Sequence, residues 1–300
     1  MIALMGAAGN VGGKVADLLL GWDQDVRVLE HRRRLGELEE RGAEVVTGDA
    51  LNAEDLRALF RDADAAFVVL PDNLDDPHFV ANRARMSRAI TEALAETAVG
   101  HVVALSMVAA DREGAPGPPG GLHDHERRLA GLEHVNLFLL RPAAYMDYLL
   151  ASLPMIRSQG LNGSAIDGDL SYPMVATRDV AQEAAERLAR RDFTGRQSRK
   201  LLGPEDVSMR QATRLIGSLL GMPELPYVQF PPADVQRGLV AAGISEEAAR
   251  LLVEMQLGIN DGWFFGGLRR TADTATPTRL EEFLKEALSG VTGTGEGGRA

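Results

Sequence analysis

Short runs of apolar residues alternate with longer segments of helical periodicity along the first half of the chain. Runs this short and apolar, each followed by a helical pattern, are typical of strands in a parallel sheet that helices cover on both faces. We therefore expect an α/β fold with a doubly wound parallel sheet. The pattern predicts strands at residues 2–5, 26–30, 44–49, 65–71, 101–106 and 135–142 and helices at residues 11–20, 33–42, 53–63 and 82–96.

The second half is less regular and predicts a smaller, mostly helical lobe. Residues 111–121, "DREGAPGPPGG", form a long loop that is rich in turn residues. A later helix is expected to begin with Ser208 as its N-cap and to end at Gly221. The division that we expect is a sheet domain at residues 1–150, onto which a helix at residues 177–191 packs back, a lobe at residues 151–288 and a disordered tail at residues 289–300.

Composition narrows the classes of protein that the chain can represent. It has no cysteine, which excludes disulfides and thiolate metal ligands, and we expect no metal site. No stretch reaches the roughly 18 to 20 unbroken apolar residues that cross a bilayer, and the first residues lack a basic leader. We therefore expect a cytoplasmic protein with no membrane partner. The formal net charge of -11 argues against nucleic-acid binding, which depends on neutralising phosphates.

Three glycines near the start of the chain carry the clearest chemical signal. Gly6, Gly9 and Gly12 form the pattern G-x-x-G-x-x-G between the first predicted strand and the first predicted helix. One glycine lets the backbone leave the strand, a second lets a diphosphate approach the main chain, and a third lets the helix pack closely. The free N–H groups and the positive end of the helix dipole then face the anion. This context favours a dinucleotide site over a plain glycine turn.

The end of the second predicted strand bears on the choice between NAD and NADP. Glu30 is placed to accept hydrogen bonds from the adenosine ribose and to repel a 2′-phosphate. The arginines that follow, Arg32 and Arg33, either bind that phosphate or begin a solvated helix. We expect NAD(P)H as the cofactor, with NAD slightly favoured over NADP. Asp49 follows the third predicted strand, where its carboxylate either reaches the adenine or belongs to a turn that ends the strand.

Several segments, taken in order, resemble the NmrA-like group of atypical short-chain dehydrogenases/reductases. They are "GAAGNVGG", "GAEVVTGDALNAEDLRALFRDADAAFVVLP", "HVVALSMVAAD", "FLLRPAAYMDYLL", "VATRDVAQEAAERL" and "LLGPEDVSMRQATRLIGSLLG". The resemblance covers most of residues 1–230 and implies a Rossmann domain that binds NAD(P)H, followed by a small substrate lobe. Ser106 matches the position where the fifth strand meets the nicotinamide. The residues expected at the dinucleotide site are Gly6, Ala8, Gly9, Asn10, Val11, Gly12, Glu30, His31, Arg32, Asp49, Ala50, Leu70, Pro71 and Ser106.

The chain departs from the family in two ways. Many members have an arginine where this sequence has His31 and a neutral residue where it has Glu30, which weakens the usual expectation of NADP. Short-chain dehydrogenases normally carry a Tyr-x-x-x-Lys pair, in which the tyrosine gives the proton and the lysine lowers its pKa. No tyrosine here has a lysine four residues on; the tyrosines are Tyr145, Tyr148, Tyr172 and Tyr227.

The region that would hold the missing pair reads "GLHDHERRLAG" and contains His123 and His125. A histidine titrates near neutral pH and can give a proton to a substrate as hydride arrives, so these two are the candidate catalytic residues. The alternative is that they belong to a solvated helix start. Met107 and Tyr145 are expected to line the substrate pocket, although Tyr145 is equally compatible with a place in the core.

Two functions remain open from the sequence. The first is an NAD(P)H-dependent oxidoreductase that reduces a small carbonyl, enone or quinone-like compound, with the cofactor supplying the difficult chemistry. The second is a regulatory protein that senses NAD(P) without turning it over, as some relatives of this family do. In either case the expected partner is a small molecule, and a homodimer is left open.

Overall fold

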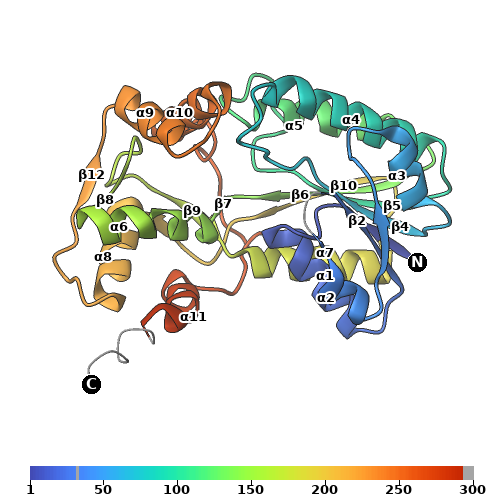
Figure 1. Ribbon diagram of the computed structural model, residues 1–300, viewed down its shortest axis with the longest axis horizontal. Coiled ribbons are helices and arrows are strands. Elements are labelled where there is room, and N and C mark those ends of the chain that lie inside the picture. Colours follow the sequence, from blue (N-terminus) through green and yellow to red (C-terminus); the bar gives the residue numbers. More distant parts are fainter. Residues whose placement is uncertain (32–33, 293–300) are drawn as a thin grey trace.

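The larger part of the molecule is built on a seven-stranded sheet, which Figure 1 shows in the computed structural model of residues 1–31 and 34–292. The strands lie in the order β10-β6-β5-β4-β1-β2-β3, and every pairing is parallel. The strands are β1 (Ile2–Leu4), β2 (Val26–Glu30), β3 (Glu44–Thr47), β4 (Ala65–Val68), β5 (His101–Leu105), β6 (Asn136–Pro142) and β10 (Arg196–Leu201). The strand order reverses next to β1, so the predicted doubly wound fold is confirmed.

Helices cover both faces of this sheet (Figure 1). One face carries α1 (Asn10–Gly21), α2 (Gly36–Glu40) and α7 (Thr177–Arg190), and the other carries α3 (Ala53–Phe60), α4 (Phe79–Ala95) and α5 (Gly120–Ala130). Side chains alternate along each strand, so Phe67 of β4 packs in the first hydrophobic cluster while Ala66 and Val68 pack in the second. Burial on both faces explains why the central strands consist of continuous apolar runs.

The start of helix α8 (Met209–Leu219) follows the sequence prediction. The Ser208 hydroxyl accepts a hydrogen bond from the Gln211 N–H over 3.2 Å, and the Gln211 side chain accepts one from the Ser208 N–H over 2.9 Å. This reciprocal pair is a capping box, which satisfies two donors at the end of the helix. The predicted N-cap at Ser208 is therefore confirmed.

A smaller lobe follows β6 in the chain. Its strands form a three-stranded sheet in the order β11-β9-β7 and a pair of β12 with β8. These strands are β7 (Ala144–Tyr145), β8 (Asn162–Ser164), β9 (Ser171–Val175), β11 (Asp206–Ser208) and β12 (Tyr227–Gln229). The helices around them, besides α8, are the 3₁₀ helix η1 (Met146–Ser152), α6 (Leu153–Gln159), α9 (Pro232–Ala241), α10 (Glu246–Asn260) and α11 (Leu280–Thr292). A separate hydrophobic cluster forms the core of this lobe.

The chain crosses from the sheet domain to the lobe and returns once. Helix α7 packs against α1, and β10 then adds an edge strand next to β6. Residues beyond 150 thus supply both a helix and a strand to the first domain, and the strand has no counterpart in the sequence prediction. Helix α11 extends to Thr292, so the first residues of the expected tail are helical, and residues 293–300 lie outside the described part of the chain.

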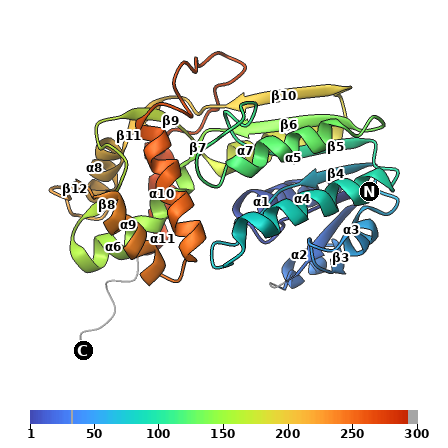
Figure 2. The ribbon, with the colours of Figure 1, turned by 90° about the horizontal axis from the view of Figure 1, so that it is seen from above.

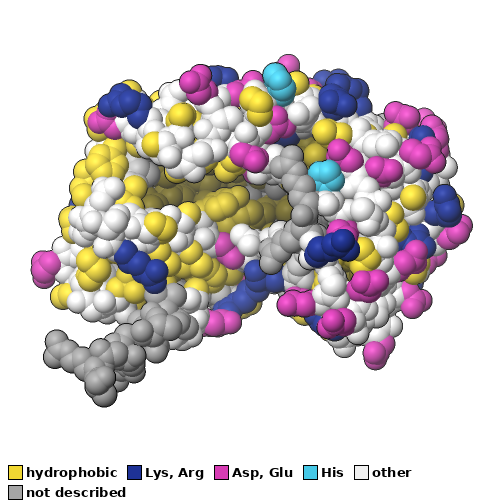
Figure 3. All heavy atoms as spheres, in the orientation of Figure 1, with side chains coloured by type: hydrophobic (Ala, Val, Ile, Leu, Met, Phe, Trp, Pro, Cys, Tyr) yellow, Lys and Arg dark blue, Asp and Glu magenta, His cyan; other side chains and the backbone are white. Residues whose placement is uncertain are grey.

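A cleft separates the two lobes at the edge of the large sheet. In Figure 3 the surface is hollowed there, and the side chains seen on its floor are mostly hydrophobic. Figures 1 and 2 show the parallel strands running toward the smaller lobe, so their carboxyl ends lie at this cleft. In doubly wound folds ligands bind at this edge, where the strand order reverses. None of the helices within residues 1–31 and 34–292 combines the length and hydrophobicity of a bilayer-spanning segment.

Candidate active site

The glycine turn after β1 has the close backbone contacts that a dinucleotide site requires. Gly6 has a φ of +71°, and a Cβ added to it would lie 2.7 Å from Cγ1 of Val69. The Gly9 N–H donates to the Gly6 carbonyl over 2.9 Å, and a Cβ added to Gly12 would lie 2.2 Å from the same oxygen. Distances this short leave no room for a side chain at Gly6 or Gly12. The backbone of the turn is therefore not covered by side chains at these two positions.

Helix α1 begins at Asn10 without a capping side chain. Its N-cap is Gly9, and the first turn contains no acidic residue. Val11 is buried against the sheet, whereas Ala8 and Asn10 are exposed. The N–H groups of the first turn and the positive end of the helix dipole therefore favour an anion that comes from outside the protein. The diphosphate of a dinucleotide fits this arrangement.

Glu30, the last residue of β2, turns its carboxylate toward its own chain. Its Oε2 accepts a hydrogen bond from the Leu35 N–H over 2.8 Å, and its Oε1 lies 3.9 Å from Nη1 of the exposed Arg34. The whole residue is only 8% exposed. The sequence does not reveal this direction, because the partner N–H belongs to a turn whose shape depends on the fold. A fixed negative charge thus stands at the carboxyl end of β2.

The neighbouring residues of the expected adenosine side also have partners in the protein. Nδ1 of the exposed His31 lies 3.1 Å from the Gly48 carbonyl oxygen, and Arg32 lies outside the described residues. Oδ1 of Asp49 accepts a hydrogen bond from the Leu51 N–H over 2.9 Å. Asp49 therefore forms part of the turn between β3 and α3.

Ser106 has the most unusual environment along the cleft edge. It follows β5 directly, is 6% exposed, and its N–H donates to the Leu140 carbonyl over 2.8 Å. Its hydroxyl has no hydrogen-bond partner within the part of the chain that the structure describes. A buried hydroxyl without a partner costs free energy, and such groups are frequent at functional sites. Nearby, Leu70 is buried, and Pro71 and Ala50 are half-buried.

The structure places His125, one of the two candidate catalytic residues, in a buried position between two helices. The residue is 1% exposed between α4 and α5, and its Nδ1 lies 2.9 Å from the Ser87 hydroxyl. Burial, together with the charges of Arg83 and Arg128, lowers its pKa to about 3. The imidazole is therefore neutral at physiological pH and does not reach the cleft. The helical face that carries His125 packs against α4, a contact that the sequence pattern does not specify.

Glu126, the next residue, stabilises the fold. It forms a two-pronged ion pair with Arg141 of β6, with Nε to Oε1 at 3.0 Å and Nη2 to Oε2 at 2.6 Å. Both side chains are largely buried, and Asp111 lies 3.4 Å from the same guanidinium. The carboxylate raises the pKa of Arg141 despite the opposing effect of burial. This ion pair fixes α5 against the sheet.

His123 lies differently from His125. It is half-buried near the start of α5, and its Nδ1 lies 2.9 Å from the Ala110 carbonyl oxygen. A carbonyl only accepts hydrogen bonds, so Nδ1 carries the hydrogen and the neutral ring presents Nε2 as its acceptor. Ala110 belongs to the turn that follows Ser106, since its own N–H donates to the Met107 carbonyl. His123 is thus tied to the loop at the end of β5.

Two tyrosines lie close together where the chain enters the smaller lobe after β6. The rings of Tyr145 in β7 and Tyr148 in η1 have centroids 5.6 Å apart. Desolvation and the nearby charges of Asp72 and Asp147 raise the pKa of Tyr148 to about 12, so its phenol keeps its proton. Met107 is half-buried where three hydrophobic clusters meet. Met107 and Tyr145 are the residues that the sequence predicts for a substrate pocket, and the Tyr148 ring lies beside Tyr145.

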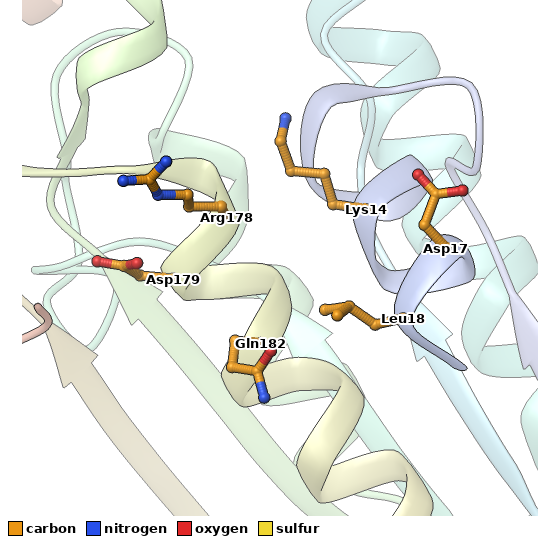
Figure 4. A pocket seen from close by; sticks show the side chains of 6 residues that line it. All are labelled: Lys14, Asp17, Leu18, Arg178, Asp179 and Gln182. Carbon is orange, nitrogen blue, oxygen red and sulfur yellow. The ribbon is translucent and has the colours of Figure 1, made fainter. Parts of the chain in front are cut away.

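A second recess, of about 370 Å³, lies on the outer side between α1 and α7 (Figure 4). Its charged groups have partners in the protein: Asp17 pairs with Arg41, and the Asp179 carboxylate accepts from the Thr278 hydroxyl over 2.6 Å. Arg178 pairs with two glutamates of α11. The recess is therefore a seam between packed helices. Its lining residues are Lys14, Asp17, Leu18, Arg178, Asp179 and Gln182.

Comparison with known proteins agrees with this description. A family described as NAD(P)H-binding matches residues 6–148, which include the glycine turn, Ser106 and Tyr145. The chain is 31% identical over 225 residues to (4-alkanoyl-5-oxo-2,5-dihydrofuran-3-yl)methyl phosphate reductase of Streptomyces griseus, covering 74% of this chain and 75% of that protein. It is also 23% identical to an NAD(P)H azoreductase of Xenophilus azovorans, over 85% of this chain and 86% of that one.

Solved structures share the fold. The NADPH-dependent quinone oxidoreductase of Escherichia coli, solved with NADPH, has a TM-score of 0.79 and 21% identity and covers 96% of this chain and 100% of its own. The triphenylmethane reductase of a Citrobacter species, solved with NADP(H), has a TM-score of 0.76 and 19% identity, with 96% and 100% coverage. The fold and the matched family define an NAD(P)H-dependent reductase. The chain belongs to the NmrA-like group of atypical short-chain dehydrogenases/reductases.

Proposed function

We propose that the chain reduces a small conjugated carbonyl compound, an enone or quinone, in the cleft between its lobes. The observation that carries this proposal is the buried hydroxyl of Ser106, which has no hydrogen-bond partner among the described residues and lies at the edge where the glycine turn also lies. The hydrophobic floor of the cleft favours an acceptor with a flat apolar body (Figure 3). The names of the relatives support this class, since a butenolide, an azo compound and a quinone are all conjugated acceptors.

In this proposal Ser106 binds the oxygen of the acceptor. NAD(P)H, when bound, supplies the hydride, and the acceptor takes up one proton to complete a two-electron reduction. The Ser106 hydroxyl donates its hydrogen bond to the acceptor oxygen, which draws electron density toward that oxygen as hydride arrives. Because the hydroxyl is buried and has no partner in the described chain, it loses no competing hydrogen bond when it binds.

The proton comes from His123 in this proposal. Its Nδ1–H is held by the Ala110 carbonyl, which fixes the ring and leaves Nε2 as the atom that binds and releases the catalytic proton. Replacing His123 with alanine should lower kcat by at least tenfold at neutral pH. His134 is the matched control, because its Nε2 also lies near a backbone carbonyl, at 3.2 Å from the Leu94 oxygen, but it precedes β6 and so lies at the opposite end of the sheet from the cleft. Equal rates for the His123→Ala and wild-type proteins would remove His123 from the reaction.

We further propose that NADH is preferred over NADPH. The support is the carboxylate of Glu30, which is fixed by the Leu35 N–H at the end of β2, where a 2′-phosphate would meet its negative charge. The Glu30→Gln variant keeps the shape and the hydrogen-bond acceptor but removes the charge. Its affinity for NADPH should rise by roughly 3- to 10-fold while that for NADH changes little. Tighter binding of NADPH than of NADH by the wild-type protein would overturn this preference.

The substrate class is tested with a panel of acceptors that differ in one feature each. Oxidation of NADH and NADPH is followed with a quinone, a cyclic enone, an azo dye and the saturated ketone that matches the enone. Turnover with the conjugated compounds and little with the saturated ketone is expected. A preference for the saturated ketone would contradict the proposed class, and binding of the dinucleotide without turnover of any acceptor would favour the sensing role instead.

A further inference from the structure

Arg83 is a buried cation that the reaction described above does not use. It stands on the inner face of α4, and its side chain is 9% exposed. Placing a charge in such a position costs several kcal/mol of desolvation, and an apolar residue would often serve stability equally well. Burial indeed lowers the pKa of Arg83. This cost indicates that Arg83 has a role besides stabilising the fold.

The contacts of Arg83 join two loops at the rim of the cleft. Its Nη1 lies 3.3 Å from a carboxylate oxygen of Asp72, which follows Pro71 in the loop between β4 and α4. The same Nη1 donates to the Pro118 carbonyl over 2.5 Å, in the loop that leads into α5. One guanidinium thus holds a segment from the dinucleotide side and a segment from the substrate side of the cleft.

Neighbouring contacts fix the guanidinium from the other directions. It lies over the Phe79 ring at 5.2 Å from the centroid, and Phe79 packs with Ala248 and Leu251 of α10 in a small cluster between the lobes. A Cβ added to Gly117, next to Pro118, would lie 2.4 Å from the Leu251 carbonyl oxygen. The loop that Arg83 holds is therefore clamped between α4 and α10.

Among the described residues, Asp72 is the anionic group that pairs with Arg83 at close range. His125, which packs beside it between α4 and α5, is neutral because its pKa falls to about 3. Tyr148 keeps its proton because its pKa rises to about 12. Asp72 is therefore the anion that balances the guanidinium. Because the two groups are paired, Arg83 determines where the loop after Pro71 lies.

We infer that Arg83 is a positioning residue for the dinucleotide: by holding Asp72 and the Pro118 carbonyl it sets the loop of Leu70 and Pro71 against the nicotinamide half. This rests on the binding of NAD(P)H at the carboxyl edge of the sheet. The contacts of Arg83 that the structure shows are with protein groups, namely Asp72, the Pro118 carbonyl and the Phe79 ring. Arg83 acts by keeping the loop in its binding conformation before the dinucleotide arrives, which reduces the ordering cost of binding.

The test measures dinucleotide affinity by calorimetry together with the kinetics of the purified protein. Arg83→Met should raise the Kd of the dinucleotide about tenfold and leave kcat at saturation within about threefold of wild type. Arg83→Lys keeps the charge and should recover part of the affinity. Arg85→Met is the matched control, since Arg85 lies on the exposed side of the same helix and bonds only Asn82 within the described chain.

A thermodynamic cycle separates positioning from general stability. Asp72→Asn, at a side chain that is 42% exposed, should raise the Kd as well, and adding it to Arg83→Met should raise the Kd no further. If Arg83→Met fails to fold, Asp72→Asn and Arg83→Lys still decide the matter. A lowered Tm with an unchanged Kd in these variants would overturn the inference. Failure of the wild-type protein to bind either dinucleotide would instead overturn the proposed function.

Discussion

The glycine turn and helix α5 stand at the same edge of the sheet but keep their shapes by different means. The turn is made of main chain, and its distances leave no room for a Cβ at Gly6 or Gly12. Helix α5 is held by side chains, above all by the ion pair of Glu126 with Arg141. A site made of main chain is fixed by steric exclusion, whereas a site made of side chains depends on distant partners and on their charge.

The largest effect is expected where the backbone leaves no space. Gly12→Ala places a Cβ against the Gly6 carbonyl and should weaken dinucleotide binding at least 100-fold, as measured by calorimetry. Gly21→Ala is the control in the same helix, because nothing lies within 4 Å of its added Cβ. If the Gly12→Ala protein folds and binds the dinucleotide with wild-type affinity, the glycine turn is not fixed by steric exclusion, and the contrast with helix α5 fails.

For helix α5, which is held in place by side chains, the largest expected effect is on the free energy of unfolding. Glu126→Ala leaves Arg141 largely buried without its main partner and should lower the free energy of unfolding by about 3 kcal/mol in urea titrations. Glu133→Ala, at an exposed residue just after α5, should change it by less than about 0.5 kcal/mol. If both variants behave alike, the ion pair does not hold α5 in place.

Ser106 and Ser87 form a matched pair of buried hydroxyls, one without and one with a partner. Ser106→Ala should lower kcat about tenfold while leaving stability unchanged or raised, because its hydroxyl makes no hydrogen bond to the described part of the chain. Ser87→Ala should lower stability by about 1 kcal/mol with kcat unchanged, since it removes the partner of His125. The reverse pattern would show that Ser106 belongs to the fold and not to the chemistry.

A further expected effect is the pH dependence of stability that comes from His125. Its native pKa of about 3 lies below the ordinary value of 6.5, so the unfolded chain binds the proton more readily between these values. The contribution of the neutral ring is complete above pH 6.5 and is lost progressively as the pH falls toward 3. Between about pH 7.5 and 5.5, protonation of this histidine in the unfolded chain should lower the free energy of unfolding by about 1.4 kcal/mol.

The variant His125→Asn isolates this contribution, because asparagine offers polar atoms to Ser87 without a proton to gain in this range. Its stability should fall less over the same pH interval, although it starts lower. Nuclear magnetic resonance of the wild-type ring provides a second measurement. A His125 resonance that titrates near pH 6.5 would contradict the buried, neutral state.

The sequence predicts the parts of this molecule that depend on local patterns. The central strands are buried on both faces and therefore read as apolar runs, and the glycine pattern reports local steric limits. Strand β10 escapes prediction because it is an edge strand with the polar sequence "RQSRKL". The roles of His125 and Glu126 depend on Ser87 and Arg141, and the direction of Glu30 depends on the Leu35 N–H. Periodicity along the chain does not encode these tertiary partners.

The transfer of hydride within the cleft is tested most directly with isotope-labelled cofactor. NADH and NADPH deuterated at the transferable position of the nicotinamide are incubated with the wild-type protein and a cyclic enone, and the product is analysed by mass spectrometry. We predict a product with one carbon-bound deuterium from the wild-type protein and none from Gly12→Ala under the same conditions. Tight dinucleotide binding by the wild-type protein, with no deuterium in the product of any conjugated acceptor, would contradict the account.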